Sequence, residues 1–130
     1  MGRKLQHSKD PLISIVDDDL SLVEAVVSLL QSAGYKAKGF HSADDFLKSR
    51  RLHSTACLIL DVRMPGMGGL ELQRRLAAEN LQIPIIFITS YESEDVRTQA
   101  PAVAFLSKPF SQESLFEAVR SALADQERGS

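Results

Sequence analysis

The stretch LILDVRMPGMGG, residues 58–69, decides the fold expected of this chain. An apolar run that is too short for a helix ends at one acid, Asp61, and a proline and three glycines follow at once. Short apolar runs bounded by turn residues are typical of buried strands. A helical pattern begins at Leu70, so the stretch predicts a strand, a tight turn and a helix, with Asp61 at the end of the strand.

Four other runs predict strands. LISIV (12–16), PIIFIT (84–89) and AVAFL (102–106) are apolar and short, as expected for buried strands. YKAKGF (35–40) is weaker, and its lysines predict a sheet edge, because lysine there discourages pairing with other chains. Five strands that alternate with helices predict βαβ units, and therefore a parallel sheet covered on both faces.

Helical patterns separate these strands. Apolar residues with a 3.6-residue period mark the first helix, and Gly34 is expected to end it. Ser42 and Ser111 are the expected N-caps of the second and last helices. The fourth helix is expected over residues 93–100; it is short and ends against Pro101.

Polar residues follow four of the predicted strands. They are the acidic run 17–19, then Asp61, Thr89 and Lys108. Each has an ordinary interpretation as a helix cap, a turn residue, a strand residue or a surface lysine. Because the carboxyl ends of parallel strands share one edge, and ligands bind there, the four together predict a functional site.

The chemistry of such a site follows from its charges. Two carboxylates about 4 Å apart repel by about 4 kcal/mol at an effective dielectric of about 20, and a divalent cation removes that repulsion. Oxygen ligands suit Mg²⁺, which also holds substrate phosphates. A carboxylate can attack phosphorus to form an aspartyl phosphate, while a hydroxyl and an ammonium hold phosphoryl oxygens.

Composition limits the function classes. The 130 residues, 44% of them hydrophobic, suit one domain. The net charge of −2 lacks the basic excess of a DNA-binding module, so no direct nucleic acid contact is expected. The lone Cys57 is expected to be a core residue, and with no signal peptide or membrane-spanning stretch, a cytoplasmic location and no membrane partner are expected.

Four blocks in order, IVDDD, LILDVRMPGMGGLEL, IPIIFITS and AFLSKPF, resemble the signature of a two-component response-regulator receiver domain. The resemblance runs from residue 12 to about residue 124. It implies a flavodoxin-like, doubly wound α/β fold with strand order 2-1-3-4-5 and five helices, the fourth shortened. The domain is expected over residues 11–124, with tails at 1–10 and 125–130.

The same resemblance implies a set of metal ligands. Asp61 matches the phosphoacceptor, and Asp17 with Asp18 matches the acidic metal pair. Asp18 and Asp61 should bind Mg²⁺ directly, Asp17 through water, and Arg63 through its backbone carbonyl. Asp19 is left over and is assigned to capping the first helix, with metal binding as the lesser alternative.

The resemblance also implies how the phosphoryl group is held. Thr89 matches the switch hydroxyl, Lys108 the lysine that contacts the phosphoryl group, and Phe105 the switch aromatic. The bond between Lys108 and Pro109 is expected to be cis, as is usual in receivers. Asp61, Thr89 and Lys108 are thus the residues expected to carry the phosphoryl chemistry.

The same resemblance implies a function. A histidine kinase or phosphotransfer protein is the expected donor, and the chain is not expected to be an enzyme beyond acting on its own phosphate. Residues 90–107 are shorter than in the family, which leaves homodimerisation open. Arg63 and Tyr91 are expected to shield the acyl phosphate from water. The residues of the motifs DVRMPGMGGLEL and KPF favour a DNA-binding output domain beyond this chain.

Two alternatives remain at this stage. One is a hydrolase with an aspartyl nucleophile, like the haloacid-dehalogenase phosphatases, but these need a second aspartate where this chain has Arg63. The other is a binding module on the same fold that works without phosphorylation.

Overall fold

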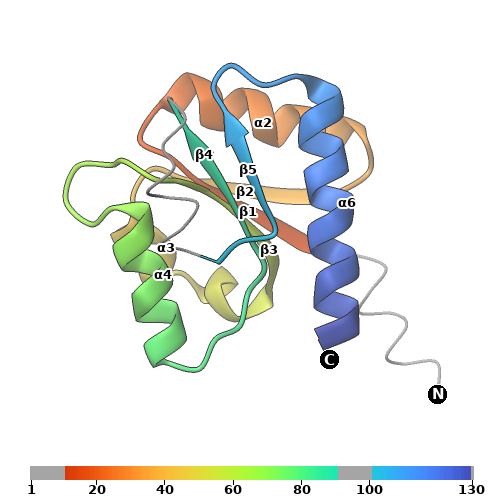
Figure 1. Cartoon of the computed structure of the whole chain (residues 1–130). Helices are drawn as coiled ribbons and strands as arrows, with labels where there is room; N and C mark the ends of the chain where they lie inside the picture. Colours follow the sequence, from red (N-terminus) through yellow and green to blue (C-terminus); the bar gives the residue numbers. More distant parts are fainter. Residues whose placement is uncertain (1–10, 91–100, 130) are drawn as a thin grey trace.

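The computed structural model describes residues 11–90 and 101–129, which form a five-stranded parallel sheet with helices on both faces (Figure 1). The strand order is β2-β1-β3-β4-β5, which confirms the predicted order and the edge position of the lysine-bearing strand. All four neighbouring pairs are parallel. The strands are β1 (Leu12–Val16), β2 (Lys36–Phe40), β3 (Thr55–Asp61), β4 (Ile85–Thr89) and β5 (Ala104–Ser107).

The predicted helix ends are present. Ser42 Oγ accepts a hydrogen bond from the Asp45 N–H at 3.1 Å, and Ser111 Oγ accepts one from the Ser114 N–H at 3.0 Å. Gly34 adopts the positive φ of +95° that favours glycine after a helix. The helices are α2 (Leu20–Ser32), α3 (Ala43–Lys48), α4 (Gly69–Ala78), α6 (Gln112–Gly129) and the 3₁₀ helix η1 (Arg50–Ser54).

Two features differ from the helix predictions or lie beyond them. The second predicted helix is present as α3 and is followed by η1, which was not predicted, because Ser49 leaves the helical conformation and accepts a hydrogen bond from the Arg51 N–H at 2.9 Å. The helix predicted over residues 93–100 lies outside the described residues. No helix in the described ranges is long and apolar enough to cross a membrane.

The sheet separates two apolar cores. Helices α2 and α6 cover one face, where Ile13, Ile15 and Cys57 are fully buried. Helices α3 and α4 cover the other, where Leu58 and Leu60 are fully buried. Burial raises the pKa of Cys57 to about 12, as suits the predicted core residue. The alternating side chains of β3 thus anchor the strand that carries Asp61 from both sides.

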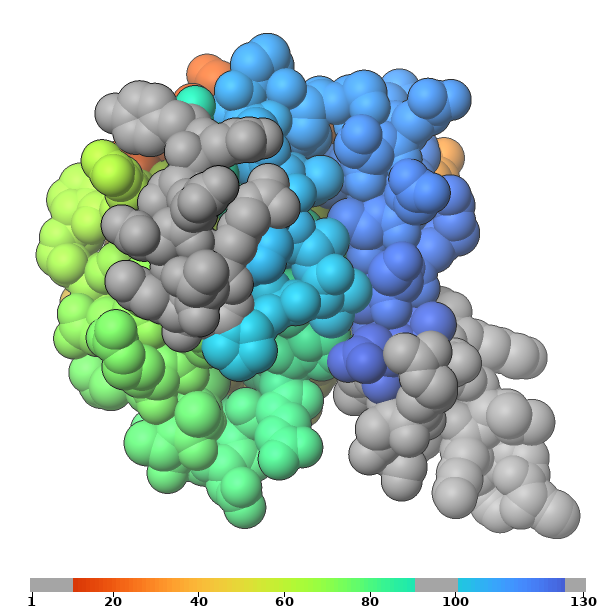
Figure 2. All heavy atoms as spheres, viewed as in Figure 1, coloured from red at the N-terminus to blue at the C-terminus, as the bar shows by residue number. Residues whose placement is uncertain are grey.

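The strand ends align the polar residues at one edge of the sheet. Asp61 pairs in register with Ile88, and Thr89 pairs with Ser107. The Lys108 N–H donates to the Thr89 carbonyl at 2.7 Å, which continues the pairing past β5. The strand β5 forms the other edge of the sheet. Its segment, light blue in Figure 2, reaches the surface between the green atoms of α4 and the darker blue atoms of α6.

Candidate functional site

The structure brings three predicted acids together. Asp17 follows β1, Asp18 is the next residue, and Asp61 ends β3. Each offers a carboxylate oxygen, and the three oxygens lie within 4.8 Å of one another. Asp17 is fully buried and Asp61 is 5% exposed, whereas Asp18 is exposed to solvent. This arrangement buries two negative charges and presents the third at the opening.

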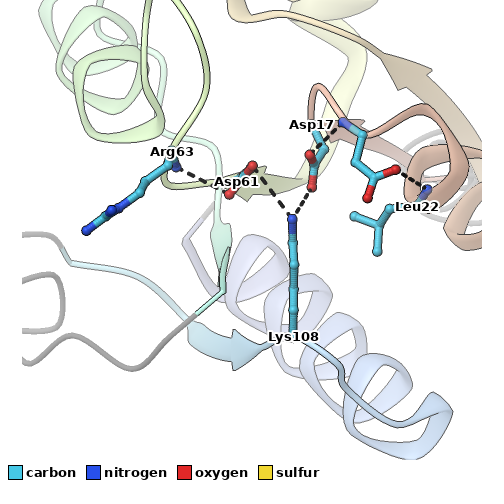
Figure 3. Close-up of polar contacts among 6 residues, drawn as sticks. Asp17, Leu22, Asp61, Arg63 and Lys108 are labelled. Carbon is cyan, nitrogen blue, oxygen red and sulfur yellow. Dashed lines mark hydrogen bonds and ion pairs between the residues drawn. The ribbon is translucent and has the colours of Figure 1, made fainter.

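Lys108 reaches the acids from the end of β5. Its Nζ lies 3.1 Å from Asp17 Oδ2 and 3.7 Å from Asp61 Oδ2 (Figure 3). Burial lowers the pKa of Lys108, but the contact with Asp17 and the charge of Asp61 outweigh that effect, so the pKa is raised overall. The ammonium is therefore held in its charged form. The bond from Lys108 to Pro109 is cis, as predicted.

The folded protein disfavours the charged form of the Asp61 carboxyl group. Burial, reinforced by the charge of Asp17, raises the pKa of Asp61 to about 7. The charge of Lys108 and a 3.2 Å hydrogen bond from the Arg63 N–H to Asp61 Oδ1 oppose the rise without cancelling it. One ammonium beside three carboxylates leaves an excess of negative charge, so the cluster favours a further cation.

Changing Asp61 to Asn is expected to stabilise the metal-free fold, more at high pH than at low pH. Asp61 ionises near pH 3.8 when unfolded but near pH 7 when folded, so between these values the folded state binds the extra proton. Stability therefore falls as the pH rises through this window. Urea unfolding in EDTA should show a gain for Asp61→Asn that is larger by about 1 to 2 kcal/mol at about pH 8 than at about pH 5. An equal gain at both pH values would contradict this cause.

The donor set fits a divalent cation. Asp17 Oδ2 is buried and makes no hydrogen bond to any described residue, although Lys108 Nζ lies near it as an ion-pair partner. A buried carboxylate oxygen that accepts no hydrogen bond is costly, and the Lys108 ammonium, which Asp61 shares, compensates its charge only in part. The ligands gathered here are carboxylate oxygens, which suit hard cations such as Mg²⁺ and Ca²⁺ better than soft ones.

Thr89 and Phe105 lie on the neighbouring strands β4 and β5. Thr89 is 8% exposed at the end of β4. Phe105 on β5 is half-buried and stacks on Phe87 of β4, with ring centroids 5.8 Å apart and an interplanar angle of 20°. Both predicted switch residues are thus placed on the strands that lead to the site.

The described residues do not test the expected shielding of the acyl phosphate by Arg63 and Tyr91. Arg63 is exposed, and its side chain points away from Asp61, whereas its backbone N–H donates to the Asp61 carboxylate (Figure 3). Tyr91 lies outside the described residues. Shielding therefore stays a prediction.

A glycine turn places Asp61 against the start of α4. The Gly69 N–H donates to the Val62 carbonyl at 3.0 Å, and Gly66 has a φ of +77°. A methyl group on Gly69 would overlap the carbonyl oxygen of Asp61. Glycine therefore lets the helix approach the strand end more closely than any other residue would.

Comparison with known proteins assigns the chain to a family. Residues 13–120 match the response regulator receiver domain family. The chain belongs to this family. This receiver domain is 44% identical over 126 residues to the response regulator protein TmoT of Ectopseudomonas mendocina, which covers 95% of the chain and 57% of TmoT.

Two further relatives support the same assignment. The transcriptional regulatory protein FixJ of Bradyrhizobium diazoefficiens is 35% identical over 118 residues, covering 88% of the chain and 58% of FixJ. The solved structure of the response regulator StyR has a TM-score of 0.84 and 42% identity, covering 92% of the chain and 62% of StyR. The receiver domain spans a little over half the length of these curated relatives. The chain therefore belongs to the receiver family and not to the haloacid-dehalogenase phosphatases named as an alternative.

Proposed function

We propose that this receiver domain accepts a phosphoryl group on Asp61 from a histidine kinase or phosphotransfer protein. One observation carries the proposal. Asp61 is buried at the end of a rigid strand, with two further carboxylates within 4.8 Å and the Lys108 ammonium 3.7 Å away. An acid held there is positioned as a nucleophile whose product charge the site can accept.

Mg²⁺ is the proposed cofactor. Asp18 and Asp61 would bind it directly, Asp17 through water, and Arg63 through its backbone carbonyl. The ion would neutralise the carboxylates and the oxygens of the incoming phosphoryl group. The buried Asp17 oxygen that accepts no hydrogen bond and the all-oxygen donor set support this choice.

The residues of the chain account for the remaining chemistry. An Asp61 oxygen forms a bond to phosphorus while the bond from phosphorus to the donor imidazole nitrogen breaks, and the imidazole keeps the electron pair and takes up a proton. Lys108 and Thr89 are proposed to hold phosphoryl oxygens, the first as an ammonium and the second as a hydroxyl donor. Because the product stays attached to the chain, we propose no enzyme activity beyond this self-directed reaction.

The proposed output is a shift between two conformations. A phosphoryl group adds a charge of about −1.5 to −2, and it can favour one conformation only through differential contacts. Thr89 lies in register with Ser107, two residues from Phe105, so movement of its hydroxyl would be transmitted to β5. TmoT and FixJ are longer than this chain, and FixJ is a transcriptional regulatory protein, so we propose that the receiver domain acts on a DNA-binding output domain. We also propose a cytoplasmic location.

Intact mass spectrometry after incubation with acetyl phosphate tests the proposed function. We expect a gain of about 80 Da with MgCl₂, none in EDTA, and none for Asp61→Asn. Asp44→Asn, which removes an acid in the first turn of α3, is the control and should still gain the mass. If the unaltered chain gains no mass, a binding module that works without phosphorylation becomes the better account.

A further inference from the structure

Asp19 makes three hydrogen bonds that connect β1 to α2. Its N–H donates to Asp17 Oδ1 at 2.9 Å. Its own Oδ1 accepts from the Leu22 N–H at 3.2 Å, and its carbonyl accepts from the Val23 N–H at 3.0 Å. The assignment of Asp19 as the cap of this helix is thereby confirmed, with a second contact that the cap assignment did not include.

This second contact determines how the Asp17 carboxylate is oriented. Because Asp17 Oδ1 is occupied by the Asp19 N–H, Oδ2 is the oxygen that faces Lys108 and Asp61 (Figure 3). Oδ2 is also the oxygen without a hydrogen bond. The Asp19 amide therefore holds the orientation of a fully buried carboxylate, with one oxygen bound to the amide and the other directed to Lys108.

The same bonds restrain Asp18. It lies between Asp17, which is fixed by burial, and Asp19, which is fixed to the first turn of α2. Asp19 has an extended backbone, with φ of −84° and ψ of 102°, as an N-cap requires. Loss of the cap would free the first turn of the helix and the backbone of both preceding acids.

We propose that Asp19 is a positioning residue for the metal-binding acids, acting through its cap on α2 rather than by touching the metal. The inference rests on the proposed Mg²⁺ site. Helix capping depends on a side-chain oxygen and does not require a negative charge, since serine and asparagine cap as well as aspartate. The role predicted for Asp19 can therefore be separated from a simple electrostatic one.

Four substitutions of Asp19 make that separation. Asp19→Asn and Asp19→Ser keep an oxygen that can accept from the Leu22 N–H but remove the charge, which otherwise acts on Lys108. Asp19→Ala removes both. Asp19→Gly also removes both, with a smaller loss of helix stability, so it replaces the alanine variant if that variant does not fold. Ser42→Ala removes the equivalent cap of α3 and is the matched control.

The test is a titration of the full ¹⁵N-labelled chain with MgCl₂, followed by NMR at the backbone amides of Asp17 and Asp61. We expect Asp19→Ala to weaken Mg²⁺ binding about fivefold, and Asp19→Gly, which costs the cap less, about threefold. Asp19→Asn, Asp19→Ser and Ser42→Ala should stay within about twofold of the unaltered chain. Exchange of the Leu22 amide should quicken in the alanine and glycine variants alone.

Two results would overturn the inference while leaving the proposed function intact. One is unchanged Mg²⁺ binding in Asp19→Ala and Asp19→Gly. The other is a loss in Asp19→Asn as large as that in Asp19→Ala, which would assign the effect to charge. If the unaltered chain shows no response to Mg²⁺ at Asp17 and Asp61, the proposed function itself fails, and the inference fails with it.

Discussion

Replacing Gly69 with alanine is expected to destabilise the fold by about 2 to 3 kcal/mol and to displace Asp61. The added methyl group would overlap the Asp61 carbonyl oxygen and would lie 3.1 Å from both the Asp61 carbonyl carbon and Val62 Cα. All these atoms are backbone, so no side chain can rotate away. Either the end of β3 or the start of α4 must move.

Urea unfolding of Gly69→Ala beside Gly68→Ala measures this effect. Gly68 has an ordinary φ of −82°, and a methyl group there would lie 3.2 Å from the Val62 carbonyl oxygen, a much milder contact. We expect the Gly68 variant to lose less than about 1 kcal/mol. Equal losses in the two variants would show that the close approach of α4 to Asp61 does not set the requirement for glycine.

Replacing Lys108 with methionine is expected to lower the melting temperature of the metal-free protein by about 10 °C. Asp17 is fully buried, and Lys108 Nζ, at 3.1 Å, is the cation that faces its Oδ2 among the described residues. Removing one partner of a buried ion pair leaves the other charge without compensation, at a cost of about 2 to 4 kcal/mol after allowance for the partial exposure of Lys108.

Mg²⁺ should reverse most of this loss. A cation bound by the acids compensates the same charges, and a ligand that binds only the folded state raises its stability. Thermal unfolding in EDTA and in MgCl₂ measures both effects, with Lys38→Met on the exposed edge strand β2 as the control. A loss that MgCl₂ does not reduce would contradict a cation site at these acids.

The alternation of apolar runs and helical patterns was sufficient to predict a parallel sheet and the meeting of Asp17, Asp61 and Lys108, whereas the strand order came from the family resemblance. Parallel strands end at a common edge, so residues that follow buried runs must gather there wherever the runs lie in the chain. The caps at Ser42 and Asp19 were also predictable, because capping depends on local spacing. Family resemblance added roles to these positions.

Contacts that depend on tertiary packing were not predictable. Ser14 hydrogen-bonds Thr55 Oγ1 at 2.7 Å, and Thr55 donates to the Arg51 carbonyl at 2.7 Å, which satisfies two buried hydroxyls that sequence patterns did not indicate. The closer approach of Lys108 to Asp17 than to Asp61 likewise depends on side-chain packing. The available signal for the Ser14 contact was one polar residue in each of two neighbouring strands, Ser14 in the middle of β1 and Thr55 at the start of β3.

The central claim is that Asp61 itself forms the acyl phosphate, and borohydride reduction tests it most directly. Borohydride converts an aspartyl phosphate to homoserine, which tandem mass spectrometry locates in the sequence. After treatment with acetyl phosphate and MgCl₂, the account predicts homoserine at residue 61 and at no other aspartate. Homoserine at Asp17 or Asp18, or a phosphoryl group that survives borohydride on another side chain, would contradict the account.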